Sequence, residues 1–493
     1  MISALRRNWP ALMLGLGAAL GHAPWSLWVL SIASFILFFL WLARSTGKKL
    51  LDFFTSFWVF GTGYFILALS WIVEPFLVDA AAHGWMAPFA LCLMASGMAL
   101  FWALSGVGYV WLGPWGGLAF FVVGEWLRGH VFTGFPWGMP SYVLIETPLR
   151  AWFSVLGPYG TTLLLLAVCL AFAHALVYRS RREIGIAILG LLISASPMVW
   201  RVQSKSEPPL MSVRLVQPNA PQAQKWDPNF APIFYERLIA ATQQNPHPDL
   251  IVWPESAITN LLNYAPDMID EIRTAADGTP VVLGALRFDD QDRLKNSFVL
   301  LHGQDQVSVY DKSHLVPFGE YLPFEPLLRP LGLGFFYDLF GGAFSAGDGP
   351  ELMSLPSGQT MLPLICYELI FPDLVRHTSM RPDVIVQITN DAWFGTWSGP
   401  YQHLAQAKAR AIENGISVVR VANTGISTVI APDGTLLKAL GLGTQGAIDL
   451  AVPVPYNTTF YWRFGDLGVA IMLALMLFAA SCGRMCNKML TSL

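Results

Sequence analysis

Long apolar runs separated by short polar segments fill the first 200 positions of the chain, and one more such run lies near its C-terminus. A helix needs about 20 apolar residues to cross a bilayer. We therefore expect eight membrane-spanning segments: 9–22, 25–43, 53–73, 85–105, 109–127, 152–177, 184–200 and 464–482. The pattern predicts an α-helical transmembrane bundle over residues 1–200, with seven spans, and a final transmembrane helix at 464–482.

The region 211–455 has a different pattern, in which short β-rich runs alternate with amphipathic segments. The expected strands are 211–219, 249–255, 280–288, 296–303, 307–312, 360–368, 383–390, 417–425 and 427–434. The expected helices are 228–244 and 400–414. Near-continuous apolar strands interleaved with helices favour an α/β layered domain whose sheets are covered by helices.

Composition supports this division. Only 13% of the residues are charged, against roughly 25% in an average soluble domain, and the deficit falls on the two apolar regions. The net charge of −3 and the lack of a basic run give no reason to expect a nucleic acid as partner. Of five cysteines, Cys366 alone falls in the soluble region, and no CxxC or His-rich spacing is visible. We therefore expect no disulfide framework, no metal and no cofactor.

The charged residues that flank the apolar runs predict an orientation. Four basic clusters precede the first span, follow the second, follow the sixth and follow the eighth: Arg6 and Arg7; Arg44, Lys48 and Lys49; Arg179, Arg181 and Arg182; Arg484 and Lys488. With eight spans, all four clusters lie on one side, which the positive-inside rule makes cytoplasmic. The start of the chain looks like a signal peptide, but no small-residue cleavage site follows it, so we interpret it as an uncleaved first helix. Both termini are then cytoplasmic, and the soluble domain lies outside the cytoplasm.

Three strand ends in the soluble region carry polar groups. They are Glu255 in IVWPESA, Lys312 with Glu320 in YDKSHLVPFGEY, and Cys366 in LICYE. Each has an ordinary explanation when taken alone: a carboxylate near a helix N-terminus, a solvated lysine, a packed thiol. Together these explanations need independent coincidences at successive strand ends, where α/β folds place active groups. We therefore interpret the three strand ends as one catalytic site.

The motifs themselves resemble those of a known family. WPE, then DKxHLVPFGE, then Cys-Tyr-Glu, in that order, resemble the nitrilase superfamily with its Glu–Lys–Cys triad, as do NDAWFG at 390–395 and RAIENG at 410–415. Such a domain placed before the last span of a multi-spanning protein, together with EWLRGHVFTGFPW at 125–137, resembles the apolipoprotein N-acyltransferase family.

This resemblance implies a fold and a reaction. The soluble domain would be an αββα sandwich in the periplasm, carried by a bundle of eight helices in the bacterial inner membrane. The reaction would move an acyl chain from a phospholipid, such as phosphatidylethanolamine, to the N-terminal amine of a diacylglyceryl-modified cysteine on a lipoprotein. The partners are therefore the phospholipid donor, the diacylated apolipoproteins and the membrane.

By position in the motifs, the resemblance makes Glu255 the general base, Lys312 the triad lysine and Cys366 the nucleophile. The supporting or substrate-binding residues would be Glu320, Tyr367, Glu368, Trp226 and Asn296. A free thiol is mostly protonated at neutral pH, so a base must take its proton before it attacks. Lys312 and the backbone N–H after Cys366 would stabilise the oxyanion, and such donors are commonly worth about 3–4 kcal/mol each. A ping-pong course through a thioester is expected.

Two lipid substrates imply apolar loops that reach the membrane, and the candidates are 332–342 and 390–400. One alternative is a membrane-anchored nitrilase-type amidase or lipid hydrolase with the same triad, but eight spans exceed what an anchor requires. Another alternative is a transporter or receptor. Ionisable residues within the apolar regions are few, Glu125 and Arg128 being the clearest, and this gives little for a transport path.

Overall fold

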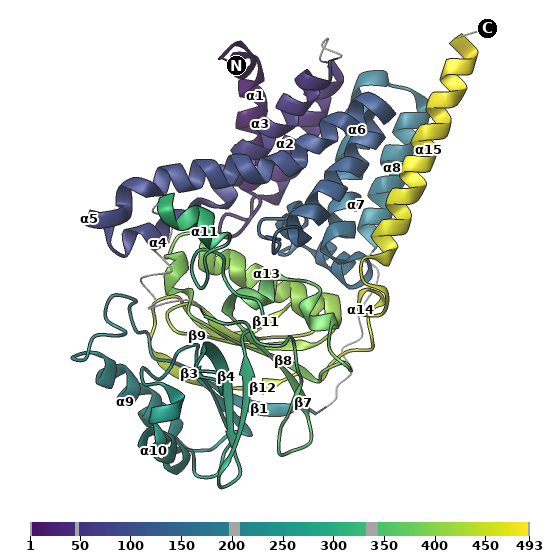
Figure 1. Ribbon diagram of the computed structural model, residues 1–493. Coiled ribbons are helices and arrows are strands. Elements are labelled where there is room, and N and C mark those ends of the chain that lie inside the picture. The colour runs from purple at the N-terminus through teal and green to yellow at the C-terminus, as the bar shows by residue number, and fades with distance from the viewer. Residues whose placement is uncertain (1, 45–48, 197–207, 332–343, 492–493) are drawn as a thin grey trace. The chain divides into compact units, whose positions relative to one another are not determined.

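The computed structural model describes residues 2–44, 49–196, 208–331 and 344–491 (Figure 1). The expected loop 332–342 lies outside the described residues. Contacts divide the chain into two units. The helical unit comprises Met1–Gln203, Trp397–Glu413 and Thr458–Leu493, and the sheet unit comprises Ser204–Thr396 and Asn414–Asn457.

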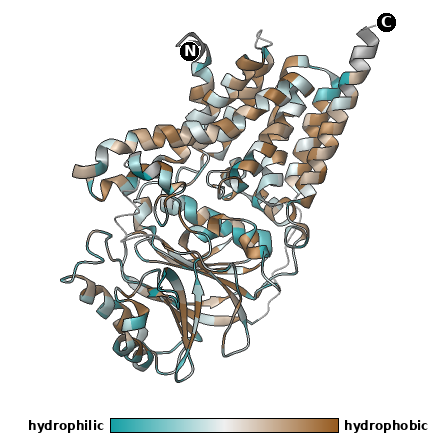
Figure 2. Ribbon diagram, viewed as in Figure 1, coloured by the Kyte–Doolittle hydropathy of each residue, from teal (hydrophilic) through white to brown (hydrophobic). Residues whose placement is uncertain are grey.

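Apolar residues dominate the long helices of the helical unit (Figure 2). These helices are α1 (Ile2–Ala19), α2 (Trp28–Arg44), α3 (Leu50–Ala68), α6 (Ala87–His130), α7 (Phe153–Tyr178), α8 (Arg181–Ala195) and α15 (Leu467–Thr491). Short helices α4 (Glu74–Leu77), α5 (Ala80–His83) and α14 (Phe460–Phe464) connect them. The unit also holds most of α13 (Gly399–Asn414).

Within the described residues, three helical stretches are long and apolar enough to cross a membrane: Leu50–Ala68, Ala80–His130 and Pro148–Tyr178. Two shorter apolar helices, Trp28–Arg44 and Leu467–Cys482, coincide with the expected spans 25–43 and 464–482. The expected spans 9–22 and 184–200 fall largely in α1 and α8, which do not meet the same criterion, and residues 197–200 lie outside the described part. The chain is thus a membrane protein, while the number of eight spans stays a prediction.

Helix α6 is a hairpin rather than one straight rod. Gly113, in its middle, has φ 77° and ψ −170°, which is not helical and which a residue with a side chain rarely adopts. A Cβ atom on Gly124 would lie 2.2 Å from the carbonyl oxygen of Phe101, whereas a straight helix would separate these residues by roughly 35 Å. The chain therefore folds back at Gly113, and the two arms correspond to the separate spans expected at 85–105 and 109–127.

The second arm of α6 ends in a buried ion pair. Arg128 donates to both carboxylate oxygens of Glu125 at 2.8 Å, and its remaining amino group donates to the carbonyl oxygens of Phe135 and Trp137 at 2.5 and 2.8 Å. Trp102 also donates to Glu125, at 2.5 Å. A buried ion pair is tolerated when further hydrogen bonds satisfy both partners, as here. The two ionisable residues singled out in the sequence therefore fix the loop that follows α6.

That loop continues into contacts with α13, all of them inside the helical unit. Trp137 donates its indole N–H to Gln402 at 2.6 Å. Lys408 pairs with Glu146 at 2.6 Å, and other contacts join Arg410 of α13 to the same region. The helix that follows the NDAWFG motif is thus held by the membrane part of the chain.

The sheet unit contains two six-stranded sheets. The first has the order β12-β1-β2-β3-β4-β5 and comprises β12 (Gly446–Val452), β1 (Met211–Gln217), β2 (Leu250–Val252), β3 (Val281–Phe288), β4 (Leu294–His302) and β5 (Gln306–Asp311). The second has the order β11-β10-β9-β8-β7-β6 and comprises β11 (Leu436–Leu440), β10 (Ser427–Ile430), β9 (Ser417–Ala422), β8 (Val384–Thr389), β7 (Thr360–Ile365) and β6 (Met353–Ser354). Strands β1, β2 and β3 run parallel, as do β7, β8 and β9.

Helices α9 (Ala231–Thr242) and α10 (Pro266–Ala276) pack on the first sheet. Leu238 of α9 and Ile272 of α10 share a buried apolar cluster with Trp253, which directly follows β2. The Trp253 indole also donates to Thr242 at 3.0 Å. Burying side chains of this size contributes about 1.5–3 kcal/mol each, so the end of β2 is held firmly in place.

The layered α/β prediction is confirmed, and every expected strand and helix has a counterpart, with ends shifted by a few residues. Among the described residues of the sheet unit, five helices and strands were missed: α10, α11 (Glu325–Leu328), β6, β11 and β12. Strands β11 and β12 lie at or next to the sheet edges, and their mixed sequences LLKAL and GAIDLAV lack an uninterrupted apolar run. The expected strand 427–434 ends at Ile430, because PDG at 432–434 forms a turn.

Candidate active site

The polar residues singled out in the sequence meet where several strands of the sheet unit end. Cys366 directly follows β7, Lys312 directly follows β5, and Glu255 lies three residues beyond β2. Their exposed fractions are 6%, 1% and 7%. β2 belongs to the first sheet and β7 to the second, so the two sheets each deliver a functional group, and Cys366 interacts electrostatically with both Glu255 and Lys312.

Glu255 is held by hydrogen bonds on both carboxylate oxygens. Asn296, in β4, donates its side-chain N–H to Oε1 at 2.8 Å, and the backbone N–H of Asn390 donates to Oε2 at 2.8 Å. Gly284 of β3 approaches so closely that a Cβ there would lie 2.6 Å from the Glu255 Cα. Donors aimed at both oxygens fix the direction of the carboxylate.

Lys312 forms an ion pair with Glu320. Its Nζ donates to Glu320 Oε1 at 2.8 Å, and the other Glu320 oxygen accepts from the Val316 N–H at 2.7 Å. Burial disfavours the ammonium, but Glu320 and Glu255 outweigh it, so the pKa of Lys312 is raised. Asn296 also donates to Glu320 Oε1, at 3.2 Å. Asn296 thereby bridges the two carboxylates, and Lys312 stays positively charged.

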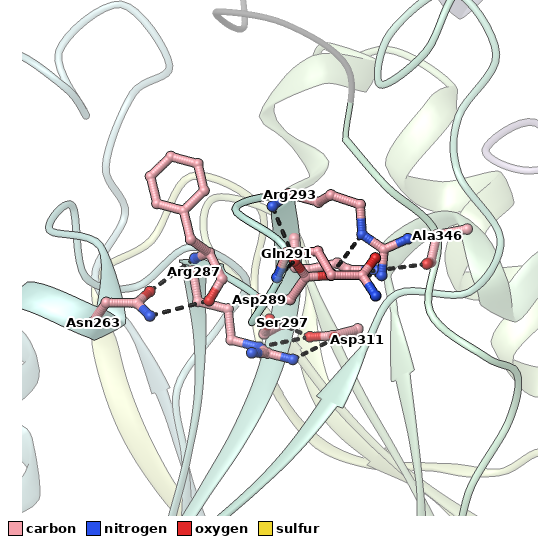
Figure 3. A network of polar contacts seen from close by, with 10 residues as sticks. Asn263, Arg287, Asp289, Gln291, Arg293, Ser297, Asp311 and Ala346 are labelled. Atoms are coloured by element: carbon pink, nitrogen blue, oxygen red, sulfur yellow. Dashed lines mark hydrogen bonds and ion pairs between the residues drawn. The ribbon is translucent and has the colours of Figure 1, made fainter.

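A polar network anchors the strand that presents Lys312 (Figure 3). Arg287 of β3 donates to both carboxylate oxygens of Asp311, at 2.9 and 2.6 Å, and Ser297 of β4 donates to Asp311 at 2.7 Å. The Lys312 backbone N–H donates to the Asn296 carbonyl oxygen at 2.8 Å. Three neighbouring strands are therefore linked at the residue before Lys312, which leaves its backbone little freedom.

Cys366 lies in a strained turn. Its φ is 51°, in the left-handed region that a residue with a side chain rarely adopts. Gln387 of β8 donates to its carbonyl oxygen at 3.1 Å, and Arg420 of β9 donates to Gln387 at 2.5 Å. Arg420 also pairs with Asp391. Residues buried in the second sheet therefore hold the Cys366 backbone in this conformation.

The groups around Cys366 determine whether its sulfur rests as a thiol or as a preformed thiolate. Burial raises the pKa of the thiol, nearby Glu255 raises it further, and Lys312 acts in the opposite direction. The raised pKa means that the resting residue is a thiol rather than a preformed thiolate. A reaction at this sulfur therefore requires proton transfer during the attack, and Glu255 is a buried carboxylate near the thiol.

Glu368 ties the Cys366 turn to the segment after Lys312. Its Oε1 accepts from the Tyr310 hydroxyl and the Ser313 N–H, both at 2.7 Å, and its Oε2 accepts from the Ile365 N–H at 2.8 Å. Burial raises the pKa of Glu368, and hydrogen bonds from Tyr310, Ile365 and Ser313 act against that shift. These contacts make Glu368 a connection between the ends of β5 and β7.

The remaining expected residues take peripheral places. Tyr367 is buried, and its ring packs edge-on against Phe371 with centroids 5.2 Å apart. Trp226 is 43% exposed, and its ring centroid lies 5.9 Å from Lys225 Nζ. The structure thus brings Glu255, Asn296, Glu320 and Lys312 together directly. Trp226 lies beside Lys225, which in turn contacts Glu255.

Sequence reasoning missed several residues of this site. Lys225 donates from Nζ to the Glu255 carbonyl oxygen at 3.0 Å, and Asn390 contacts the Glu255 carboxylate as described. Asn390 belongs to NDAWFG, which we had regarded as part of a loop that touches lipid; only Trp397, 61% exposed, fits that expectation. Gln387 and Arg420 interrupt the apolar strands DVIVQITN and SVVRVA. A polar residue inside a fully buried strand needs partners there, and this was the available signal.

Comparisons with known proteins agree with this arrangement. A family model described as carbon-nitrogen hydrolase matches residues 212–458, and one described as apolipoprotein N-acyltransferase N-terminal domain matches residues 14–171. An apolipoprotein N-acyltransferase from Brucella suis biovar 1 is 35% identical, covering 98% of this chain and 96% of the relative. A protein of the same name from Rhodopseudomonas palustris is 36% identical, covering 85% of this chain and 84% of the relative.

Among solved structures, a variant of the Nesterenkonia AN1 amidase, from the nitrilase superfamily, matches with a TM-score of 0.37 and 19% identity, covering 54% of this chain and 98% of that one. The two relatives and the two family models point to one family. The chain therefore belongs to the apolipoprotein N-acyltransferase family, a family of acyltransferases with a catalytic domain of the carbon–nitrogen hydrolase type.

Proposed function

We propose that this protein transfers an acyl chain from a phospholipid, such as phosphatidylethanolamine, to the N-terminal amine of a diacylglyceryl-modified cysteine on lipoproteins. The supporting observation is the buried cluster in which Glu255 and Lys312, joined through Asn296 and Glu320, accompany Cys366. The family assignment supports the choice of substrates. The acyl chain would travel as a thioester on Cys366, with the two substrates reacting in turn.

In the first half-reaction, Glu255 takes the proton from the Cys366 sulfur as the sulfur attacks the carbonyl carbon of the phospholipid ester. The negative charge that develops on the carbonyl oxygen is stabilised by the Lys312 ammonium and by backbone N–H groups. The carbon–oxygen bond to glycerol then breaks. Glu255 returns the proton to the glycerol oxygen, and a lysophospholipid leaves.

In the second half-reaction, the neutral amine of the lipoprotein attacks the thioester carbonyl carbon. Glu255 removes a proton from the attacking nitrogen as the tetrahedral intermediate forms. The carbon–sulfur bond breaks, the sulfur recovers its proton from Glu255, and an amide is released. Each cycle thus restores the thiol and the carboxylate.

A membrane-anchored amidase or a lipid hydrolase with the same cluster remains the alternative. The helical unit displays large apolar side chains on its surface, with exposed fractions of 73% for Leu93, 70% for Leu51 and 70% for Phe478. Such surface is typical of helices that face lipid. A chain embedded to this extent has direct access to lipid donors and acceptors, which favours acyl transfer between lipids over hydrolysis of soluble amides.

We further propose the eight-span arrangement, with the sheet unit in the periplasm and both termini in the cytoplasm of a bacterial inner membrane. The four basic clusters and the fold-back of α6 support it. A reporter enzyme that is active only in the cytoplasm, fused after residue 493, should be active. A reporter after residue 493 that is active only outside the cytoplasm would mean an odd number of spans and would contradict the arrangement.

Transfer and hydrolysis are separated by one experiment on the purified protein. Phospholipid with a labelled acyl chain should give a labelled protein whose label is released by neutral hydroxylamine, as a thioester is. Little free fatty acid should form, because a closed site keeps water from the thioester. Adding a diacylated lipopeptide with a free N-terminal amine should move the label into an amide. Steady release of fatty acid that the lipopeptide does not change would show a hydrolase instead.

A further inference from the structure

A second lysine lies in the site, and no part of the proposed reaction uses it. Lys225 follows β1 in a turn where its backbone N–H donates to the Pro221 carbonyl oxygen at 2.9 Å. Its side chain is 5% exposed, which is rare for lysine. The ammonium lies 3.0 Å from the Glu255 carbonyl oxygen and near the Trp226 ring, and none of the described carboxylates is its direct partner.

A second carboxylate, that of Glu320, lies close to Glu255. Glu255 and Glu320 accept hydrogen bonds from the same amide nitrogen of Asn296, at 2.8 and 3.2 Å. Like charges within about 6 Å of each other oppose ionisation of both. The Lys312 ammonium is in direct contact with Glu320, so this cation serves two neighbouring carboxylates. If Glu255 bound a proton for this reason, it could no longer accept one from Cys366.

We propose that Lys225 is a positioning residue for the acyl transfer, which supplies the second positive charge that keeps Glu255 ionised and ready to act as the base. Lys225 acts through Glu255 and does not contact the reacting carbonyl. The inference rests on the proposed function, because it assigns a role within the same reaction.

The titration of Lys225 fits this role at neutral pH. Burial lowers the pKa of Lys225 to about 8, against the opposing influence of Glu255 and Cys366. A lowered pKa for an amine means that the charged form is retained below about pH 8 and lost above it. Among the described residues, the other titratable groups near Glu255 are Lys312, Glu320 and the neutral Cys366 thiol, whereas Asp391 is paired with Arg420. At high pH a carboxylate ionises without help, so Lys225 matters most in the neutral and acidic range.

A purely structural role makes a different prediction. The Lys225 side chain could act only as a hydrogen-bond donor that holds the turn containing Glu255. Lys225→Gln keeps a donor and removes the charge, while Lys225→Met removes both. Lys438, exposed on β11, provides a matched control, Lys438→Gln, far from any catalytic role.

The test measures single-turnover acyl-enzyme formation with vesicles of labelled phosphatidylethanolamine. We expect both Lys225 variants to be slowed by about tenfold or more near pH 6 and to approach the wild-type rate near pH 9. The acidic limb of the pH–rate profile is then displaced toward higher pH. The Lys438→Gln profile should match wild type. A loss that is equal at every pH, or wild-type behaviour of Lys225→Gln, would overturn the inference. Recovery at high pH would itself show that the variants are folded.

A second measurement separates this inference from the proposed function. The rate of Cys366 alkylation by iodoacetamide, followed by peptide mass, reports thiol activation without any lipid. The Lys225 variants should need a higher pH than wild type for the same alkylation rate. Coincident profiles would overturn the role of Lys225, whatever the lipid assay shows. A displaced profile in a protein that never forms an acyl-enzyme would support that role and reject the acyl-transfer function.

Discussion

Replacing Cys366 by serine should lower acyl-enzyme formation by a factor of about 10³ or more, as expected when a catalytic nucleophile is lost. A serine hydroxyl holds its proton far more tightly than a thiol, so the same Glu255 carboxylate cannot remove it effectively. Serine has almost the same shape as cysteine, so the Gln387 contact to the backbone at φ 51° should persist. The measurement is the yield of hydroxylamine-sensitive label on the protein after exposure to labelled phospholipid.

The control for this variant is the joint replacement of the other cysteines: Cys92, Cys169, Cys482 and Cys486. That protein should keep its activity, because none of these residues belongs to the sheet unit. Thioester label on the Cys366→Ser protein would place the nucleophile elsewhere. Loss of activity in the fourfold variant, at normal expression, would argue against Cys366 as the sole nucleophile.

Lys312→Met should slow acyl-enzyme formation by about 10²–10³, the effect of removing one preorganised oxyanion donor. A second cost arises in the folded protein. Glu320 loses the ammonium 2.8 Å from its carboxylate, and it then lies beside Glu255, with which it shares Asn296. A buried charge left without its partner destabilises a protein by about 3–5 kcal/mol. Both acyl-enzyme yield and thermal unfolding should therefore change.

The double variant Lys312→Met, Glu320→Gln separates the two effects. It removes the unpaired carboxylate together with the lysine, so the midpoint of thermal unfolding should return toward the wild-type value. Acyl-enzyme formation should stay low, because the positive charge at the oxyanion is still missing. If the double variant regained full activity, Lys312 would only neutralise Glu320 and would not take part in the reaction. Coupling between the two sites is expected because the side chains are in contact.

The three central site residues could be found in the sequence because each follows an expected strand. Glu255 and Cys366 come where an apolar run stops, and Lys312 comes at the end of the β-rich run VSVYDK, so the pattern is local. Lys225 and Asn390 could not be found in this way. They act on Glu255 from segments 30 and 135 positions away in the chain, and the Asn390 contact uses a backbone N–H, which every residue except proline has.

The membrane part shows the same limit. Apolar composition predicted α-helices correctly. In lipid no water is available to the backbone polar groups, so a segment that is apolar on all sides pairs them within a helix. Composition did not show that Arg128 would bind two carbonyl oxygens of the following loop. Nor did it show that α13, whose sequence motif belongs to the catalytic region, would be held by Trp137 and Glu146 of the membrane region. Such contacts depend on the three-dimensional path of the chain.

Most of α13 belongs to the helical unit, whereas the strands that precede and follow it in the chain belong to the sheet unit. This affects which fragments of the chain can stand alone. The chain passes between the two units at four places: 203–204, 396–397, 413–414 and 457–458. A fragment that begins at 204 and ends at 457 would contain every residue of the site, yet it would carry α13 without the side chains that bind it. Cutting any single connection would leave the others joined, so the units stay tethered even in a nicked chain. This catalytic part is therefore interleaved with its membrane region rather than appended to it, and no single excision releases a self-contained soluble enzyme.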